Sequence, residues 1–178
     1  TSVKIIGVSG GVSYGALGST HHSLHDVAVM RTFPDMHVYL PADRFQTEKL
    51  TEYLASSDEP AYVRMGRNAV PDVYTANDTF TFGKGKVLTE GGDVAIIATG
   101  ETVYHALQAE KELRTKEIKA MVIDMHTIKP LDEELIISAA RKTGHVLTVE
   151  EHSIFGGLGG AVAEVISQHY PVKMKIIG

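Results

Sequence analysis

The sequence predicts an α/β protein, and three observations lead to that prediction. Short runs rich in Val and Ile alternate along the chain with segments that have helical patterns. The apolar runs are continuous, as in strands of parallel sheets that are covered on both faces. The alternation is interrupted in residues 66–79, which contain two Asn, two Asp and one Pro and have little periodicity. We therefore expect a partial α/β sheet in residues 1–79 and a separate α/β domain in residues 80–178, with a mostly parallel five-stranded sheet.

The individual elements follow from apolar runs and from helix start and stop signals. Asp43 is a good N-cap for the second helix. The helix expected in residues 132–142 begins with acids and ends with bases, which complements its dipole. Gly144 follows it and is a natural residue to end a helix. Residues 80–88 are expected to form one arm of a hairpin with the next strand. The expected strands are residues 3–8, 37–40, 61–65, 94–99, 120–125, 146–149 and 172–177, and the expected helices are 24–32, 43–55, 102–115, 132–142 and 158–169.

Composition excludes several classes of protein. Of 178 residues, 43% are hydrophobic and 22% charged, which is typical of a soluble globular protein with a real core. The formal net charge of -5, with both signs interspersed, argues against nucleic acid as a partner. The lack of cysteine excludes disulfides, thiolate zinc sites and cysteine nucleophiles, and fits a reducing cytoplasm. No apolar run approaches the ~20 residues that span a membrane. Both ends of the chain read as strands, so we expect a fragment of a longer protein.

Residues 9–25, SGGVSYGALGSTHHSLH, are the most unusual segment. They contain four glycines and lie between an expected strand and an expected helix. Ligands of open α/β sheets bind beyond the carboxyl ends of strands, and glycine lets the backbone approach a ligand closely. The spacing does not match a phosphate-binding P-loop. The segment is therefore either part of a binding site or a flexible surface loop.

Three histidines in this segment favour a binding site. His21, His22 and His25 have spacings that place pairs on one face of a helix. A zinc site is an alternative, but the acidic residue of an HExxH motif is missing, and no metal ligand is assigned. Local capping is the simpler role for His22 and His25. Because a neutral imidazole can polarise a substrate oxygen or move a proton, His21, nearest the glycines, is the best catalytic candidate.

Charged residues follow other expected strands at the same rim. Arg64 and Arg67 lie at the end of strand 61–65 and just beyond it, and a guanidinium suits phosphate or carboxylate. Arg67 is the stronger candidate, while a surface ion pair is an equal alternative for Arg64. Glu150, Glu151 and His152 could be catalytic or could bind a partner chain. Residues 156–160 could hold an anion at a helix N-terminus, but a tight turn that packs the helix on a strand is favoured.

Five motifs, in order, resemble those of transketolases over essentially the whole chain. They are GALGSTHHSLHDVAVMRTFPDMHVYLPAD, PAYVRMGRNAVP, FGKGKVLTEGGDVAIIATG, VIDMHTIKPLDEELI and TVEEHSIFGGLGGAVAEV. The resemblance is greatest to split transketolases, in which this half is a separate subunit. It implies the end of a pyrimidine-binding domain in residues 1–79 and a transketolase C-terminal domain in residues 80–178.

The resemblance also implies roles for individual residues. His21 is at the place of the active-site histidine that contacts the substrate, and Arg67 at that of the arginine that binds the sugar phosphate. His22 stands beside His21 and is a substrate-binding candidate. Leu17 stands where transketolases have an aspartate that contacts an acceptor hydroxyl, and Ser9 where they commonly have a phosphate-binding histidine. These two departures put the usual acceptor specificity in doubt.

The implied activity is transfer of a two-carbon ketol unit from a ketose phosphate to an aldose acceptor. The implied cofactors are thiamine diphosphate and Mg²⁺ in the complete enzyme, with no residue of this chain assigned to either. The implied partners are a second copy in a homodimer, an N-terminal transketolase subunit or domain, and sugar phosphates. We expect this chain to bind no cofactor and to be inactive alone.

Two other interpretations remain. Beta subunits of 2-oxo acid dehydrogenases and deoxyxylulose-phosphate synthases share parts of these motifs, although DMHTIKP and EEHSIFGGLGG favour transketolase. A non-enzymatic interaction module derived from the C-terminal domain belongs to a different class. A glutamate and an aromatic cluster encoded upstream would indicate an enzyme, and their absence a module.

Overall fold

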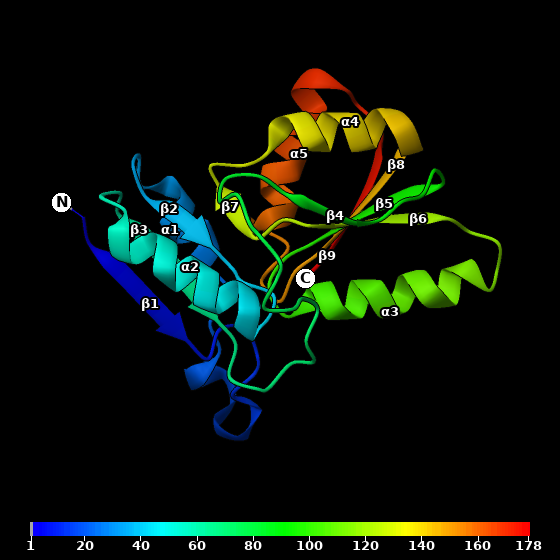
Figure 1. Ribbon diagram of the computed structural model, residues 1–178. Coiled ribbons are helices and arrows are strands. Elements are labelled where there is room, and N and C mark those ends of the chain that lie inside the picture. Colours follow the sequence, from blue (N-terminus) through cyan, green and yellow to red (C-terminus); the bar gives the residue numbers. More distant parts are fainter. Residues whose placement is uncertain (1) are drawn as a thin grey trace.

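The computed structural model describes residues 2–178, which form two sheets flanked by helices (Figure 1). The first sheet has four strands in the order β1-β3-β2-β7, and the second has five in the order β4-β6-β5-β8-β9. In the second sheet β5, β6, β8 and β9 are parallel and β4 is antiparallel. The expected α/β fold with a mostly parallel five-stranded sheet is therefore confirmed. None of the helices in residues 2–178 has the length and apolar character needed to cross a membrane.

Fifteen elements make up the described chain. In order they are β1 (Lys4–Val8), the 3₁₀ segment η1 (Gly15–His21), α1 (Asp26–Thr32), β2 (His37–Tyr39), α2 (Arg44–Ser56), β3 (Ala61–Met65), β4 (Lys86–Thr89), β5 (Val94–Ala98), α3 (Thr102–Arg114), β6 (Ala120–Asp124), β7 (Thr127–Lys129), α4 (Glu133–Thr143), β8 (His145–Val149), α5 (Leu158–His169) and β9 (Lys173–Ile177).

The first sheet has a helix on each face. Alternation along β2 sends Val38 into the apolar cluster that includes Val27 of α1, and Tyr39 into the cluster that includes Leu50 of α2. β1 is an edge strand of this sheet and is much less covered, with Ile6 51% exposed. The carboxyl ends of β1, β2 and β3 lie at one rim because these three strands are parallel.

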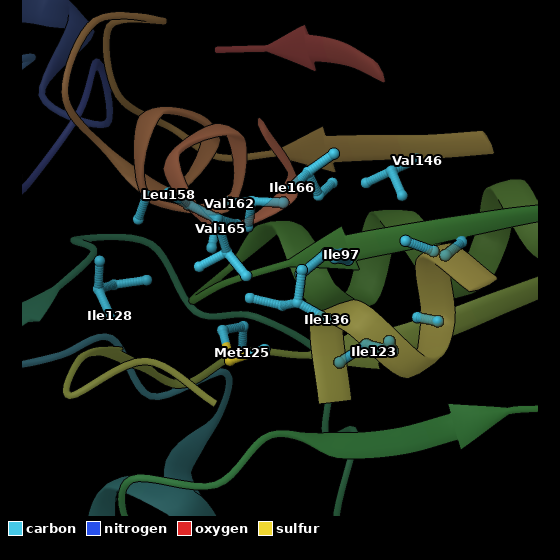
Figure 2. Close-up of a cluster of buried hydrophobic side chains, with 14 of the residues drawn as sticks. Ile97, Ile123, Met125, Ile128, Ile136, Val146, Leu158, Val162, Val165 and Ile166 are labelled. Atoms are coloured by element: carbon cyan, nitrogen blue, oxygen red, sulfur yellow. The ribbon is translucent and has the colours of Figure 1, made fainter. Parts of the chain in front are cut away.

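The second sheet also has helices on both faces. α3 packs on the face that carries Ile96 of β5, while α4 and α5 pack on the face that carries Ile97. Figure 2 shows the apolar cluster on the Ile97 face, with Ile136 of α4 and Val162 of α5 beside Ile97. This burial on both faces explains why the strands read as continuous apolar runs.

The two parts of the chain are more interwoven than the sequence suggests. β7 pairs antiparallel with β2, so a strand from the second half completes the first sheet. One apolar cluster contains Val27 and Val38 from the first sheet together with Ile97 and Ile136 from the second. The boundary at residue 79 stays a prediction, and residues 66–85 around it contain neither helix nor strand.

The expected hairpin in residues 80–88 is wrong. β4 pairs antiparallel with β6 and not with β5, the next strand along the chain. Two consecutive strands form a hairpin only if they are neighbours in the sheet. Here β6 lies between β4 and β5, so β4 pairs with β6 and not with the strand that follows it in the chain. The order of strands in a sheet cannot be read from the local sequence.

The expected helix ends are confirmed where a side chain or a glycine sets them. The Asp43 carboxylate accepts a hydrogen bond from Gln46 N, and the Asp132 carboxylate accepts one from Leu135 N. Gly144 has φ 68° at the end of α4, a conformation that costs glycine little.

Candidate functional site

The carboxyl ends of both parallel sheets meet at one rim of the molecule. β1 and β3 of the first sheet end there, opposite the ends of β5 and β8 of the second. A small cavity of about 20 Å³ lies between them. Residues from both sheets line it, namely Gly10, Leu40, Pro41, Arg64, Gly66, Thr99, Gly100, Glu101 and Glu151. The rim expected from the sequence is therefore built jointly by the two halves of the chain.

The glycine-rich segment forms a loop that is closed at its base. Gly11 and Ser23 exchange two backbone hydrogen bonds of 2.9 Å, which define what we call the glycine loop, residues 11–23. Inside it, the 3₁₀ turns of η1 bend at Gly18, which has φ 66°. No residue of η1 is buried. The loop is thus a projecting element whose position depends on what holds its base.

The structure brings His21 and Arg67 together through an aromatic ring that the sequence analysis missed. The Arg67 guanidinium carbon lies 3.9 Å from the centroid of the Tyr14 ring, and the His21 ring meets the same ring edge-on at 5.3 Å. His21 also lies 3.0 Å from the Thr20 hydroxyl. The sequence offered one indication of this role. Tyr14 is an aromatic residue between glycines, where its ring needs a packing partner such as a cation or another ring.

The other predicted site residues do not join the group formed by His21, Tyr14 and Arg67. Leu17 in the glycine loop is 48% exposed. Ser9 follows β1 with φ 63°, unusual for a residue other than glycine. His22 buries its Nε2 atom without a hydrogen-bond partner among the described residues. His25 occupies the N-cap position of α1, but its side chain makes no capping bond, so the expected local capping by His25 is wrong.

The glycines have an internal role at this rim. A Cβ atom at Gly10 would overlap the Arg64 side chain, and one at Gly11 would overlap Glu151. A Cβ at Gly66 would overlap the Glu101 carboxylate. The expectation was that glycine allows the backbone to approach a ligand, and the structure shows that it lets the backbone approach the protein's own charged side chains.

Arg64 is buried and forms an internal ion pair. Its Nε atom lies 3.2 Å from an oxygen of Asp26, which also accepts a 2.6 Å hydrogen bond from the Tyr62 hydroxyl. Its Nη2 atom donates to the carbonyl oxygens of Ser23 at 3.1 Å and Glu151 at 2.6 Å. The side chain is only 5% exposed, so the surface ion pair considered for Arg64 is wrong. It links β3, α1 and the end of β8.

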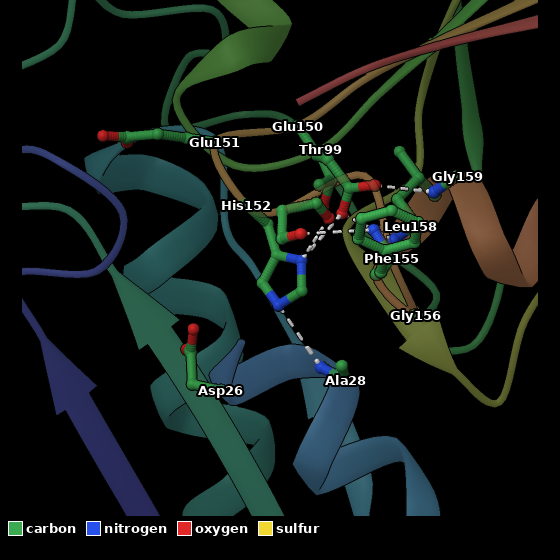
Figure 3. A network of polar contacts seen from close by, with 12 residues as sticks. Asp26, Ala28, Thr99, Glu150, Glu151, His152, Phe155, Gly156, Leu158 and Gly159 are labelled. Carbon is green, nitrogen blue, oxygen red and sulfur yellow. Dashed lines mark hydrogen bonds and ion pairs between the residues drawn. The ribbon is translucent and has the colours of Figure 1, made fainter. Parts of the chain in front are cut away.

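Glu150 and His152 are structural residues of the same rim (Figure 3). The Glu150 carboxylate accepts hydrogen bonds from Leu158 N at 2.6 Å and Gly159 N at 2.7 Å. The helix N-terminus in residues 156–160 therefore holds an anion, but that anion is the protein's own side chain. The buried His152 accepts a 3.4 Å bond from Ala28 N and donates a 2.7 Å bond to the Ser153 carbonyl.

Glu101 and Glu151 place two carboxyl groups at the cavity. Burial raises the pKa of Glu101, and the charge of Glu151 raises it further. Among residues 2–178 there is no group of three or more His, Cys, Asp or Glu side chains that could hold a metal ion. The rim therefore offers His21 from the loop and Arg67 from the segment after β3 on one side, and a carboxyl pair on the other.

Two mostly parallel sheets whose strands end at a shared rim place the chain in the α/β class. The transketolase pyrimidine-binding domain family matches residues 1–73, and the transketolase C-terminal domain family matches residues 83–176. The chain belongs to the transketolase family.

Individual relatives agree with this assignment. An apulose-4-phosphate transketolase subunit of Phocaeicola vulgatus is 59% identical over 178 residues, which are 99% of this chain and 57% of that protein. A solved split-gene transketolase, described as an inactive beta4 tetramer, has a TM-score of 0.91 and 43% identity over 99% of this chain and 57% of its own. 1-Deoxy-D-xylulose-5-phosphate synthase of Desulfotalea psychrophila is 36% identical over 90% of this chain and 26% of its own. The chain spans little more than half the length of the split transketolase relatives.

Proposed function

We propose that this chain is the C-terminal part of a thiamine-diphosphate-dependent transketolase. In the complete enzyme, the bond between carbons 2 and 3 of a ketose phosphate breaks. The two-carbon ketol unit is joined to the aldehyde carbon of an aldose acceptor, and an aldose shortened by two carbons is released. The observation that carries the proposal is the contact of both His21 and Arg67 with Tyr14 at the rim of the sheets.

Each residue has a separate task in this proposal. Arg67 is exposed and stacked on an aromatic ring, so its N–H groups at the guanidinium edge remain free to bind a phosphate. His21 is exposed near it and can hydrogen-bond a substrate oxygen or move a proton to it. Thiamine diphosphate supplies a centre that stabilises the carbanion of the donated unit. We assign the cofactor and Mg²⁺ to other parts of the complete enzyme.

The proposal includes an N-terminal subunit or domain and a second copy of this chain. The relative from Phocaeicola vulgatus is named as one subunit of a transketolase, and the solved split-gene relative is described as an inactive tetramer. By analogy, this chain associates with itself and has no ketol transfer activity until the N-terminal part is added. Sedimentation of the chain alone and mixed with that part measures both associations, and a monomer under both conditions would contradict them.

The test uses the complete enzyme with His21→Ala and Arg67→Ala variants. Loss of His21 removes a group near the reacting carbons, so kcat should fall by about 100-fold or more. Loss of Arg67 removes a charge-assisted contact worth roughly 1.5–3 kcal/mol, so KM for phosphorylated sugars should rise about 10- to 100-fold with kcat little changed. Arg44→Ala, which changes an exposed arginine of α2, is the control. Unchanged kinetics in both site variants would overturn the roles given to these residues, and absence of ketol transfer in the unmodified complete enzyme would overturn the proposal.

A second candidate is synthesis of a deoxyxylulose phosphate, favoured by the 36% identity to the synthase of Desulfotalea psychrophila. That relative matches over only 26% of its length, whereas the split transketolase relative matches over 57%. The same assay separates the two activities. Turnover of ketose phosphate without pyruvate supports transketolase, while carbon dioxide release that requires pyruvate would support the synthase.

Leu17 gives the proposal a specificity test. A site built to hydrogen-bond a hydroxyl rejects substrates that lack it, whereas an apolar side chain does not. We expect weaker preference for 2-hydroxylated acceptor aldehydes than in an aspartate-bearing transketolase, and Leu17→Asp should restore that preference. The measurement is kcat/KM for paired acceptors with and without the 2-hydroxyl. Strong discrimination by the unmodified enzyme would show that this account of Leu17 is wrong.

A further inference from the structure

We propose that Glu151 is a positioning residue for this site, through which the C-terminal domain holds the glycine loop and the Tyr14 and His21 side chains that the loop carries. This inference rests on the proposed function for its kinetic part only. Glu151 belongs to the segment after β8, far along the chain from the loop. Its side-chain oxygen nevertheless accepts a hydrogen bond of 2.9 Å from Val12 N, the second residue of the loop.

Glu151 reaches both ends of the loop. Its carboxylate binds Val12 directly. Its carbonyl oxygen accepts a 2.6 Å bond from Arg64 Nη2, and the same nitrogen donates a 3.1 Å bond to the carbonyl of Ser23, the last residue of the loop. Just beyond the loop, Ser153 N donates a 2.9 Å bond to the Leu24 carbonyl. The end of β8 therefore braces the base of the loop from both sides.

The brace is attached to a rigid part of the molecule. On one side of Glu151, the buried carboxylate of Glu150 is bonded to the first turn of α5. On the other side, His152 is only 1% exposed and is bonded to Ala28 N of α1 (Figure 3). Gly11 leaves no space for a side chain between the loop and Glu151. Because both neighbours of Glu151 are held in place and Gly11 lies against its carboxylate, a shift of that carboxylate should shift the loop as well.

The loop itself has little else to define its position. η1 buries no residue, yet it carries His21, and Tyr14 immediately before it bears the contacts to His21 and Arg67. Misplacement of a reacting group by about 1 Å can cost about 100-fold in rate. Since no hydrogen bond or ion pair joins Glu151 to His21 or Arg67 among the described residues, its effect on the reaction must pass through the loop backbone.

The kinetic test compares Glu151→Ala with Glu151→Gln in the complete enzyme. Glutamine keeps an oxygen that accepts from Val12 N, so it should stay within about 3-fold of the unmodified kcat, whereas alanine should lower kcat by about 10- to 100-fold. In a His21→Ala background, Glu151→Ala should cost less than about 3-fold more, because the group that it positions is gone. Glu112→Ala on the exposed face of α3 is the control and should change nothing.

Amide hydrogen exchange tests the same inference without activity. Exchange in peptides that cover residues 12–23 should speed up in Glu151→Ala and return towards the unmodified rate in Glu151→Gln, while peptides from α3 stay unchanged. Equal kcat losses in the alanine and glutamine variants, additive losses with His21→Ala, or unchanged loop exchange in Glu151→Ala would each overturn the inference. If loop exchange responds but the complete enzyme shows no ketol transfer, the proposed function fails and the bracing by Glu151 stands.

Discussion

Two buried polar networks, each with members from both halves of the chain, handle buried charge in opposite ways. At the rim, the buried Arg64 has the Asp26 carboxylate 3.2 Å away and two carbonyl groups as hydrogen-bond acceptors. On β6, Asp124 is fully buried and is bonded to neutral donors, the Tyr74 hydroxyl at 2.6 Å and Gln46 Nε2 at 2.8 Å. We refer to these as the rim contact and the Asp124 contact.

The difference shows how a neighbouring ion decides the cost of a buried charge. The rim contact joins opposite charges, so removing one partner leaves the other uncompensated. In the Asp124 contact, burial raises the pKa of Asp124 to about 6, although its hydrogen bonds to Tyr74 and Gln46 favour the charged form. One Asp124 oxygen has no hydrogen-bond partner among the described residues. The rim contact therefore depends on its partners, and the Asp124 contact depends on pH.

The largest effect is expected when the rim contact is broken. Arg64→Ala leaves a buried carboxylate on Asp26 without its cation, which should lower the free energy of unfolding by about 3–5 kcal/mol. Arg44→Ala is the matched control, because Arg44 pairs with Asp72 at 2.8 Å but is 71% exposed, and such pairs contribute about 0–1 kcal/mol. Urea unfolding measures both. Losses of similar size would show that burial does not distinguish the two pairs.

The next effect is a pH dependence carried by Asp124. Its folded pKa of about 6 lies above the ordinary value of 3.8, so the folded state binds the proton more tightly than the unfolded state. This group's contribution to stability is greatest below about pH 4 and falls as pH rises through 6. Asp124→Asn lacks this titration. Its stability relative to the unmodified protein should increase by about 1–3 kcal/mol between pH 4 and pH 8.

Replacing Asp124 by asparagine can also change stability by an amount that does not depend on pH. Taking the difference between pH 4 and pH 8 cancels that amount. Urea unfolding of both proteins at each pH gives the four free energies that are needed. A stability difference that does not change with pH would show that Asp124 titrates alike in the folded and unfolded states.

A third and smaller effect should come from the donor to Asp124. Burial and the neighbouring Asp124 raise the pKa of Tyr74, so its hydroxyl remains a donor at neutral pH. Tyr74→Phe removes that donor and should cost about 2 kcal/mol at pH 8, typical of a hydrogen bond to a charged group. The cost should shrink at pH 4.5, where Asp124 is protonated. Tyr170→Phe at an exposed tyrosine is the control, and a pH-independent cost would contradict the pairing.

The smallest effect is expected at the carboxyl pair beside the rim contact. Burial and the charge of Glu151 raise the pKa of Glu101, so its charged form destabilises the folded state above that pKa. Glu101→Gln removes the charge and should raise the melting temperature at pH 8, with the gain vanishing as pH falls below the raised pKa. Thermal unfolding at several pH values is the measurement. A lower melting temperature at pH 8 would show that the Glu101 charge has a stabilising partner.

Local sequence determined the parts of this protein that depend on neighbours in the chain. Continuous apolar runs predicted strands covered on both faces, and Asp43 and Gly144 predicted helix ends, because capping involves residues within one turn. The motifs also placed the chain in its family and singled out His21 and Arg67. These inferences need only spacing and residue type.

Tertiary structure alone decided what pairs across the chain. It placed β7 in the first sheet and β4 beside β6, since strand order depends on the packing of the whole molecule and not on any local pattern. It buried Arg64 between elements distant in sequence, made the Glu150 side chain the anion at the N-terminus of α5, and brought Glu151 to Val12 across 139 positions. Whether a charged residue binds a ligand or the protein itself depends on which surfaces meet, and that is settled only when the two sheets pack together.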